Sequence, residues 1–353
     1  MQPFSYTRAT DLDGAIQALA ADPQAAVVAG ATELANWLKD GISAPSTLID
    51  INGLPLADID ARPDGLRIGA LARNADVARE GAVRTVYPVI AEALEKGASA
   101  QIRNMATVGG NLLQRTRCPY FRGTSFPCNK RRPGSGCAAR TGPHRGHAIL
   151  GGSEACIATH PGDLAVALVA LDAVVQVRGS DGARSIPLDD FYLLPGESPE
   201  RETVLHHDEL IVAVEVPAGP HTARSRYLKV RDRESYEFAL VSVAACLELD
   251  GEIVRSARIA LGGVGTKPWR ARGAEAALAG RSLDADALTA AGAAAVEGAR
   301  PLRDNRFKVT LAGRAVARTL ELAADEPFGQ AGHGGSADDA VGAADGSQNG
   351  GAA

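Results

Sequence analysis

The sequence predicts an α+β protein with more than one domain. A chain of 353 residues exceeds the size at which a single hydrophobic core stops growing. Strand-like apolar runs alternate with helical patterns as far as residue 217, whereas three alternating segments and then alanine-rich helical segments follow residue 222. A change of composition at residues 218–221 marks the expected boundary between the two parts.

The composition is that of an ordinary folded protein. Apolar residues make up 45% of the chain, charged residues 22%, and the net charge is −5, which gives no global reason to expect nucleic acid or a membrane. Residues 1–20 lack a basic start followed by an apolar core, so we expect no signal peptide, and no run reaches the ~20 apolar residues of a spanning helix. We therefore expect folding in the cytoplasm, where a group of cysteines is more often metal-binding or catalytic than a disulfide framework.

The chain begins with a predicted strand over residues 4–8 and a helix capped by Asp11. A buried strand over residues 25–29 then ends at Gly30, and Thr32 is expected to cap a helix that closes at Gly41. A strand, a glycine turn and a helix start together expose backbone N–H groups that suit a phosphate, although a plain connection between a strand and a helix uses the same residues.

Later elements follow the same apolar periodicities. Strands are predicted for residues 48–51, 66–71, 173–178, 210–216, 226–231, 239–249 and 253–261, and helices for residues 89–98, 163–171, 273–278, 284–297 and 305–324. The last three strands are expected to form an antiparallel sheet with Cys246 in its core. Residues 329–353 lack apolar periodicity and are expected to be disordered.

Two further features could bind a ligand. Gly109 and Gly110 would let the backbone approach a ligand closely, while Thr107 and Asn111 beside them offer side-chain hydrogen bonds. Asp163 stands near a predicted helix start, where it could cap the helix or hold a sugar hydroxyl.

Four of the five cysteines, Cys118, Cys128, Cys137 and Cys156, lie in a proline-rich stretch through which no helix or central strand is expected to run. No acidic residue occurs between Lys96 and Ser153, and the many basic residues there are expected to depress the pKa of the thiols and favour metal-binding thiolates.

The spacing of these cysteines leaves several kinds of site open. Nine, eight and eighteen residues separate them, whereas structural zinc sites usually contain pairs two to four residues apart. Four thiolates suit an iron–sulfur cluster, whose negative charge the basic residues would offset. Zinc, disulfides and unliganded thiols remain alternatives on spacing alone.

Taken together, these segments resemble the FAD-binding subunits of the molybdenum hydroxylases, which form the xanthine dehydrogenase and aldehyde oxidoreductase family. The resemblance is nearest to the medium subunits of bacterial periplasmic aldehyde oxidoreductases. It covers roughly residues 1–325 and is carried by residues 28–34, 101–104, 107–111, 153–163, 208–217 and 227–231.

The resemblance implies a FAD-binding domain over residues 1–217, of the two-subdomain PCMH or vanillyl-alcohol-oxidase-like fold. Its subdomains would span about residues 1–55 and 56–217, with a cysteine-bearing insertion at 114–152. A C-terminal α/β domain, with a small antiparallel sheet and helices, would occupy residues 222–325.

The resemblance also implies the cofactor-binding residues. Both glycine turns would hold the FAD pyrophosphate through backbone amides, Asp163 would lie toward the ribose, and Ile211 and Lys229 would lie near the flavin or adenine. Ala31 departs from a glycine and Glu33 from an asparagine common in the family. The implied set is Val27, Val28, Ala29, Gly30, Ala31, Thr32, Glu33, Leu34, Ala35, Thr107, Gly109, Gly110, Asn111, Asp163, Ile211 and Lys229.

A subfamily with a similar insertion holds a 4Fe–4S cluster on four cysteines, which the resemblance places on Cys118, Cys128, Cys137 and Cys156. The implied function is that of an electron-transfer subunit of a heterotrimeric molybdenum hydroxylase that oxidises aldehydes or N-heterocycles. Electrons would pass from 2Fe–2S clusters in a small partner to FAD and an external acceptor, while a large partner holds the molybdenum cofactor.

This function requires no catalytic residue in the chain, and export to the periplasm could occur with a partner subunit. The alternatives are the flavin subunit of an enzyme similar to 4-hydroxybenzoyl-CoA reductase, or a zinc-dependent binding module. Nucleic acid is disfavoured because the basic loop contains few aromatic residues and the chain is acidic as a whole.

Overall fold

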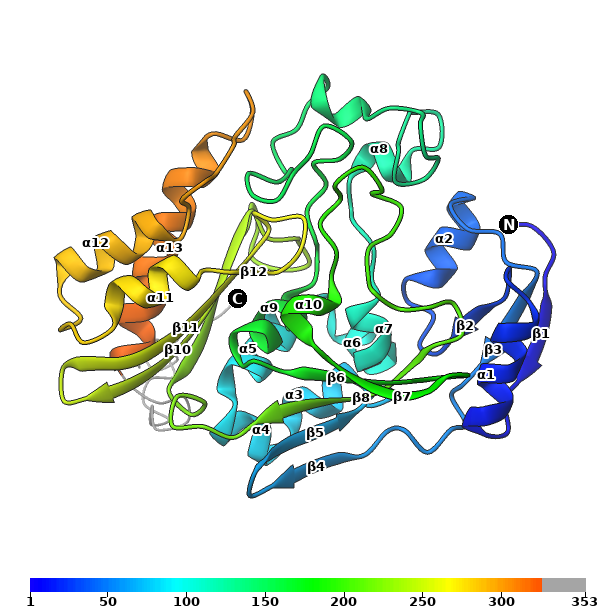
Figure 1. Cartoon of the computed structure of the whole chain (residues 1–353), viewed down its shortest axis with the longest axis horizontal. Coiled ribbons are helices and arrows are strands. Elements are labelled where there is room, and N and C mark those ends of the chain that lie inside the picture. The colour runs from blue at the N-terminus through cyan, green and yellow to red at the C-terminus, as the bar shows by residue number, and fades with distance from the viewer. Residues whose placement is uncertain (326–353) are drawn as a thin grey trace, which may run out of the picture.

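The computed structural model describes residues 1–325, and the tail predicted for residues 329–353 lies outside them. The described chain forms three sheets, each with its own helices, and the cysteine-bearing insertion lies above them in the view of Figure 1. This mixture of sheets and helices confirms the predicted α+β class. No helix among residues 1–325 is long and apolar enough to cross a membrane.

The first sheet is parallel, with the strand order β1-β3-β2. Its elements are β1 (Ser5–Arg8), α1 (Leu12–Ala21), β2 (Ala26–Val28), α2 (Leu34–Asp40) and β3 (Thr47–Asp50). Asp11 caps α1 as predicted, since its carboxylate accepts a hydrogen bond of 2.7 Å from the Gly14 amide. The β2 strand is half-buried rather than buried, because it lines a cavity.

The second sheet is antiparallel, with the order β4-β5-β8-β6-β7. Its strands are β4 (Ile59–Arg62), β5 (Gly65–Gly69), β6 (Val174–Gly179), β7 (Gly182–Pro187) and β8 (Leu210–Pro217). Its helices are α3 (Asn74–Arg79), α4 (Gly81–Val86), α5 (Pro88–Lys96), α6 (Ala100–Met105), α7 (Val108–Leu112), α9 (Asp163–Ala170) and α10 (Leu188–Phe191). The sequence did not predict the edge strands β4 and β7, because most of their residues are exposed and so show no buried apolar pattern.

The third sheet is antiparallel, as predicted, with the order β12-β11-β10-β9. Its strands are β9 (Ser225–Val230), β10 (Val241–Asp250), β11 (Ile253–Gly262) and β12 (Trp269–Arg270), and its helices are α11 (Arg272–Leu278), α12 (Ala285–Ala294) and α13 (Phe307–Asp325).

Strand β10 is buried on both faces. Ala244 and Cys246 belong to the core of the second sheet and its helices, whereas Val243 and Ala245 belong to the core beneath α11 to α13. Cys246 is therefore a core residue, as predicted. Since both faces are covered, the third sheet joins the second sheet and its helices to the C-terminal helices through one continuous layer of packing.

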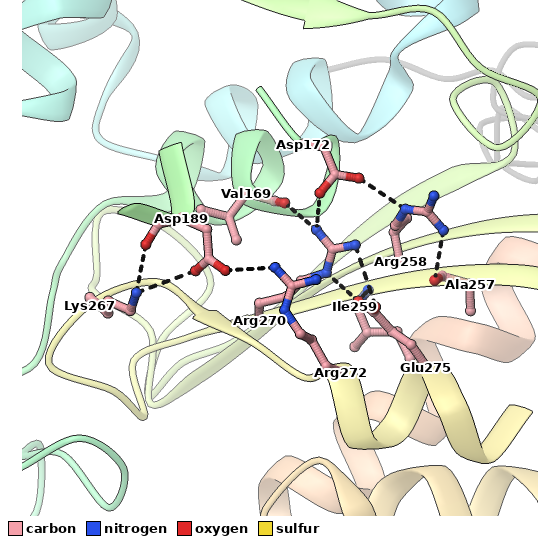
Figure 2. Close-up of polar contacts among 10 residues, drawn as sticks. All are labelled: Val169, Asp172, Asp189, Ala257, Arg258, Ile259, Lys267, Arg270, Arg272 and Glu275. Carbon is pink, nitrogen blue, oxygen red and sulfur yellow. Dashed lines mark hydrogen bonds and ion pairs between the residues drawn. The ribbon is translucent and has the colours of Figure 1, made fainter. Parts of the chain in front are cut away.

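A polar cluster also joins the second and third sheets (Figure 2). The Arg270 side chain, only 4% exposed, donates to the Val169 carbonyl at 2.8 Å and to the Asp172 carboxylate at 2.6 Å, and it also pairs with Glu275. Asp172 follows the end of α9, whereas Arg270 and Glu275 come from β12 and α11. This buried guanidinium therefore connects the end of α9 to the third sheet and α11.

We predict that Arg270→Met lowers the free energy of unfolding by about 3–5 kcal/mol, because it leaves Glu275 partly buried without its cation. Arg272→Met is the matched control. The Arg272 side chain pairs with Asp189 but is 67% exposed, so its loss should change the free energy of unfolding by at most about 1 kcal/mol. Denaturant unfolding of both variants is the measurement, and equal effects would contradict the role given to Arg270.

Candidate functional site

A cavity of about 640 Å³ lies where the three sheets and their helices meet. Its wall combines β2 and the start of α2, the segment from α5 to α7, the start of α9, the start of β8, and the connection between β9 and β10. This volume lies within the range of small-molecule and cofactor sites, roughly 300–1,000 Å³.

The first glycine turn forms one wall of the cavity. The wall includes every predicted residue from Val27 to Leu34, but Ala35 does not line it, because the next position of α2 turns away from the cavity. Within residues 1–325 no acceptor engages the backbone N–H groups of Gly30, Ala31, Thr32 and Glu33. Four unpaired N–H groups beside a cavity are suited to an anion.

The start of α2 differs from the prediction. Glu33, not Thr32, holds the N-cap position, and no side chain caps the helix. The Thr32 carbonyl instead accepts a hydrogen bond from the Asn36 side-chain amide at 3.1 Å. Ala31 has a φ of 56°, a left-handed conformation that suits glycine better than alanine. The C-terminal end at Gly41, with a φ of 71°, is as predicted.

Glycine at position 30 is required by the fold rather than by a ligand. A Cβ atom there would lie 2.0 Å from the Met105 carbonyl oxygen at the end of α6. The turn therefore packs directly against the backbone of the second subdomain.

The second glycine turn, residues 107–111, differs from the first because the backbone amides of residues 108–111 have acceptors within the fold. Thr107 caps α7 by accepting from the Gly110 amide at 3.3 Å, while the amides of Val108 and Gly109 donate to the carbonyls of Ala72 and Ala70. The Asn111 amide donates to the Thr107 carbonyl at 2.8 Å. The expectation that this turn binds through backbone amides is therefore wrong for residues 108–111, because the chain just after β5 and Thr107 already accept from all four amides. A Cβ atom on Gly110 would meet only the Thr107 hydroxyl oxygen, at 3.0 Å, so Gly110 has an open face. Asn111 also lines the cavity.

Asp163, at the start of α9, and Lys229, in β9, meet in the part of the cavity wall that we call its base. The Lys229 ammonium lies 2.8 Å from one Asp163 carboxylate oxygen, and the Tyr227 hydroxyl donates to the other at 2.7 Å. Burial raises the pKa of Asp163, whereas the Lys229 charge opposes that shift. Asp163 starts α9 without capping it. Ile211, in β8, lies in the same cavity wall.

The connection between β9 and β10 contributes cavity residues that sequence reasoning missed. Tyr236 and Phe238 both line the cavity, and the Arg117 guanidinium lies 5.0 Å from the centre of the Phe238 ring. Tyr236 has a φ of 52° and is 57% exposed. The sequence feature that could have identified these cavity residues is a pair of aromatic residues in a charged loop between two predicted strands.

The four predicted metal-ligating cysteines come together. All are free thiols that pack in one cluster with Phe121, Ala139 and Ile157, and all line one small hollow. Cys128 and Cys137 face each other in an isolated antiparallel bridge. Within residues 1–325 no group of three or more His, Cys, Asp or Glu side chains could hold a metal ion as placed here.

The insertion contains more regular structure than predicted. One helical turn, α8 (Pro119–Arg122), starts on a proline, and a short 3-10 turn, η1, spans Ala138–Arg140. Proline is compatible with the first position of a helix, since no hydrogen bond is lost there. Arginine side chains bind other parts of the backbone: Arg122 donates to the Thr116 carbonyl at 3.1 Å, and Arg131 to the Thr124 carbonyl at 3.3 Å.

The expected depression of the thiol pKa values is wrong for two cysteines. Burial raises the pKa of Cys118 to about 12 and also raises that of Cys156. The nearby cations are engaged elsewhere. Arg117 lies 2.6 Å from a carboxylate oxygen of Glu33, and Arg122 pairs with the same carboxylate. The Glu33 side chain therefore points to the insertion and away from the four unpaired amides.

Comparisons with known proteins cover nearly the whole chain. The family described as FAD binding domain in molybdopterin dehydrogenase matches residues 2–219, and the CO dehydrogenase flavoprotein C-terminal domain matches residues 226–323. The aldehyde oxidoreductase FAD-binding subunit PaoB of Escherichia coli is 51% identical over 324 residues, which cover 91% of this chain and 98% of that protein.

Other relatives are more distant. The glyceraldehyde dehydrogenase medium chain of Sulfolobus acidocaldarius is 29% identical, with 80% of this chain and 83% of that protein covered. Among solved structures, carbon monoxide dehydrogenase from Hydrogenophaga pseudoflava superposes with a TM-score of 0.71 at 27% identity, covering 92% of this chain and 98% of that chain. Quinoline 2-oxidoreductase from Pseudomonas putida 86 gives 0.71 at 26% identity, with 91% and 97% covered.

We predict that Gly30→Ala destabilises the protein by about 1–3 kcal/mol or more, because the added methyl group meets a backbone carbonyl that cannot move freely. The measurement is denaturant unfolding of cofactor-free protein, which separates this effect from ligand binding. Gly81→Ala is the control, since a Cβ atom there has no neighbour within 4 Å and should not destabilise the protein. Unchanged stability in Gly30→Ala would contradict the packing role.

Proposed function

Because the chain belongs to the family of FAD-binding subunits of the molybdenum hydroxylases, we propose that its cavity binds FAD and that it is the electron-transfer subunit of such an enzyme. The observation that carries this proposal is the cavity, in which four unpaired backbone N–H groups meet residues of both domains. Bound FAD would supply a redox centre that accepts and releases electrons; the chain's own residues bind and orient it.

The free amides at Gly30, Ala31, Thr32 and Glu33 would receive the pyrophosphate, since they have no acceptor in the described chain. Arg117 and Arg122 draw the Glu33 carboxylate aside, which lets this turn accept an anion despite its acidic residue. Gly110 and Asn111 would contact the cofactor from the opposite turn, through an open backbone face and a side chain. These features fit the polar part of FAD.

The base of the cavity suits hydroxyl groups rather than phosphate. Both oxygens of the Asp163 carboxylate already accept hydrogen bonds, from Tyr227 and from Lys229, which fixes its orientation. A carboxylate oxygen has a second lone pair, so Asp163 can still accept from a ribose or ribityl hydroxyl. Ile211 supplies an apolar surface in the same wall for a ring of the cofactor.

We further propose that Cys118, Cys128, Cys137 and Cys156 hold a 4Fe–4S cluster. All four are free and surround one hollow lined largely by apolar side chains. A cluster offers a separate iron to each thiolate, so it requires four cysteines around a space and not three ligands on one ion. The donor set is therefore more consistent with a cluster than with zinc.

The partners in this proposal are a large subunit with the molybdenum cofactor and a small subunit with 2Fe–2S clusters. Electrons would reach FAD from the small subunit and leave to an external acceptor, so this chain needs no substrate-oxidising residue. Similarity to an aldehyde oxidoreductase subunit supports aldehydes as the substrates of the complex.

We predict that Gly110→Val yields largely flavin-free protein with little loss of stability, because the side chain projects into the cavity from an otherwise open face. Released flavin is measured after denaturation and compared with unfolding of the cofactor-free protein. Gly53→Val is the control, since Gly53 has no neighbour within 4 Å and does not line the cavity. Full flavin content in Gly110→Val would remove this turn from the site.

We predict that Cys137→Ser loses iron and becomes protease-sensitive in the insertion, yet keeps a substantial part of its FAD. No cavity-lining residue lies between Arg117 and Pro161, so loosening this segment leaves the cavity wall largely in place. Iron, sulfide and flavin are measured in anaerobically purified protein, with limited proteolysis alongside. Cys246→Ala is the control and should keep its iron, since Cys246 lies in β10, outside the cysteine cluster.

Two results would contradict this account of the insertion. One is wild-type protein without iron and sulfide, and the other is a Cys137→Ser variant that keeps both the cluster and its protease resistance.

A further inference from the structure

A histidine contacts one of the four cysteines directly. The Nε2 atom of His147 lies 3.2 Å from the Sγ atom of Cys118. His147 is 5% exposed, and its other ring nitrogen, Nδ1, is buried without a hydrogen-bond partner among the described residues. The proposed function gives no task to this contact.

The direction of the hydrogen bond follows from the chemistry of both partners. A cysteine bound to iron has lost its proton, so it can only accept. A proton on Nδ1 would leave a buried N–H group unpaired, whereas a proton on Nε2 leaves only a lone pair unpaired, which costs less free energy. The ring therefore donates from Nε2 to the sulfur whenever Cys118 is a thiolate.

The C-terminal domain holds this histidine in place. Asn305, which is fully buried, donates from its side-chain amide to the carbonyls of His147 and Ala148, at 3.2 Å each. Lys308, also fully buried, donates to the carbonyl of Gly146 at 3.0 Å and to that of Gly263 at 2.7 Å. These bonds anchor the backbone on both sides of the ring to residues at the start of α13 and, through Lys308, to the residue just after β11.

On the other side of the ring, the Tyr120 ring centre lies 6.1 Å from that of His147. The His147 amide also donates to the His144 carbonyl at 3.0 Å. Among the described residues, the imidazole thus has one hydrogen-bond partner, the Cys118 sulfur.

We propose that His147 is a positioning residue that donates a hydrogen bond to the Cys118 thiolate and raises the reduction potential of the cluster. This inference rests on the proposed function, in which Cys118 ligates iron. A donor at a ligating sulfur withdraws negative charge from the cluster and stabilises the reduced state, which carries one more electron. In a buried site this stabilisation is weakly screened by solvent.

The test uses the complete complex with its partner subunits, purified anaerobically, and compares His147→Phe with His147→Gln. Phenylalanine keeps a ring beside Tyr120 but has no donor, whereas glutamine keeps a donor of similar reach. The midpoint potential of the 4Fe–4S cluster is measured at fixed pH by a redox titration followed by electron paramagnetic resonance. The midpoint potential of FAD in the same samples is the internal control.

We expect a more negative cluster potential in His147→Phe, a potential close to wild type in His147→Gln, and an unchanged FAD potential in both. An unchanged cluster potential in His147→Phe would overturn the inference. Loss of the cluster from that variant would also overturn it, because a contact that only tunes a cluster is not needed for assembly. Absence of iron and sulfide from the wild-type complex would instead overturn the proposed cluster itself.

Discussion

The cavity depends on a buried ion pair between the two domains. Asp163 at the start of α9 and Lys229 in β9 are 12% and 2% exposed at their side chains, so neither charge can recover its water while the domains stay together. A second carboxylate acts in the same interface, since Glu92 of α5 accepts from the Tyr227 amide at 2.6 Å and pairs with Arg226 at 2.8 Å. Breaking such a pair leaves a charge buried alone, which costs about 3–5 kcal/mol. These contacts hold β9 of the third sheet against α5 and α9, whose residues line the cavity.

The insertion is held by side chains from every part of the chain around it. Glu33, beside α2, pairs with Arg117 and Arg122. Glu202 pairs with Arg115 at 2.8 Å and with Lys130 at 2.7 Å. Near the start of α13, Asn305 binds the backbone carbonyl of His147. Since the segment has little regular secondary structure, its backbone polar groups need side-chain partners. The arginines of the insertion therefore pair with carboxylates and backbone carbonyls. They do not lower the pKa of Cys118 or Cys156 in the way that their number suggests.

The two glycine turns show how similar sequence patterns acquire different tasks. Gly30 allows the backbone to pack against Met105, and its turn leaves four amides without an acceptor among residues 1–325. The amides of Val108 and Gly109 instead donate to the carbonyls of the chain beside them. Of the adjacent residues Gly109 and Gly110, only Gly110 has an open face. A glycine in a sequence indicates close approach, but whether a ligand or another strand of backbone approaches is a property of the packed structure.

The sequence by itself determined the features that depend on local chemistry. The Asp11 cap, the left-handed Gly41, the antiparallel β9 to β11 and the core position of Cys246 follow from periodicity, capping and turn preferences within a few residues. The same local patterns, with the family resemblance, identified the two glycine turns, Asp163, Ile211 and Lys229 of the cavity wall and the four cysteines around the small hollow.

Only the tertiary structure decided which groups are left free and which are paired. Four such features join residues that are distant in the chain. They are the Glu33 contact with the insertion, the place of Tyr236 and Phe238 in the cavity wall, the ion pair of Asp163 with Lys229, and the contact of His147 with Cys118. Such contacts arise because burial forces each polar group to find a partner wherever the packed chain supplies one, and no local pattern records that choice.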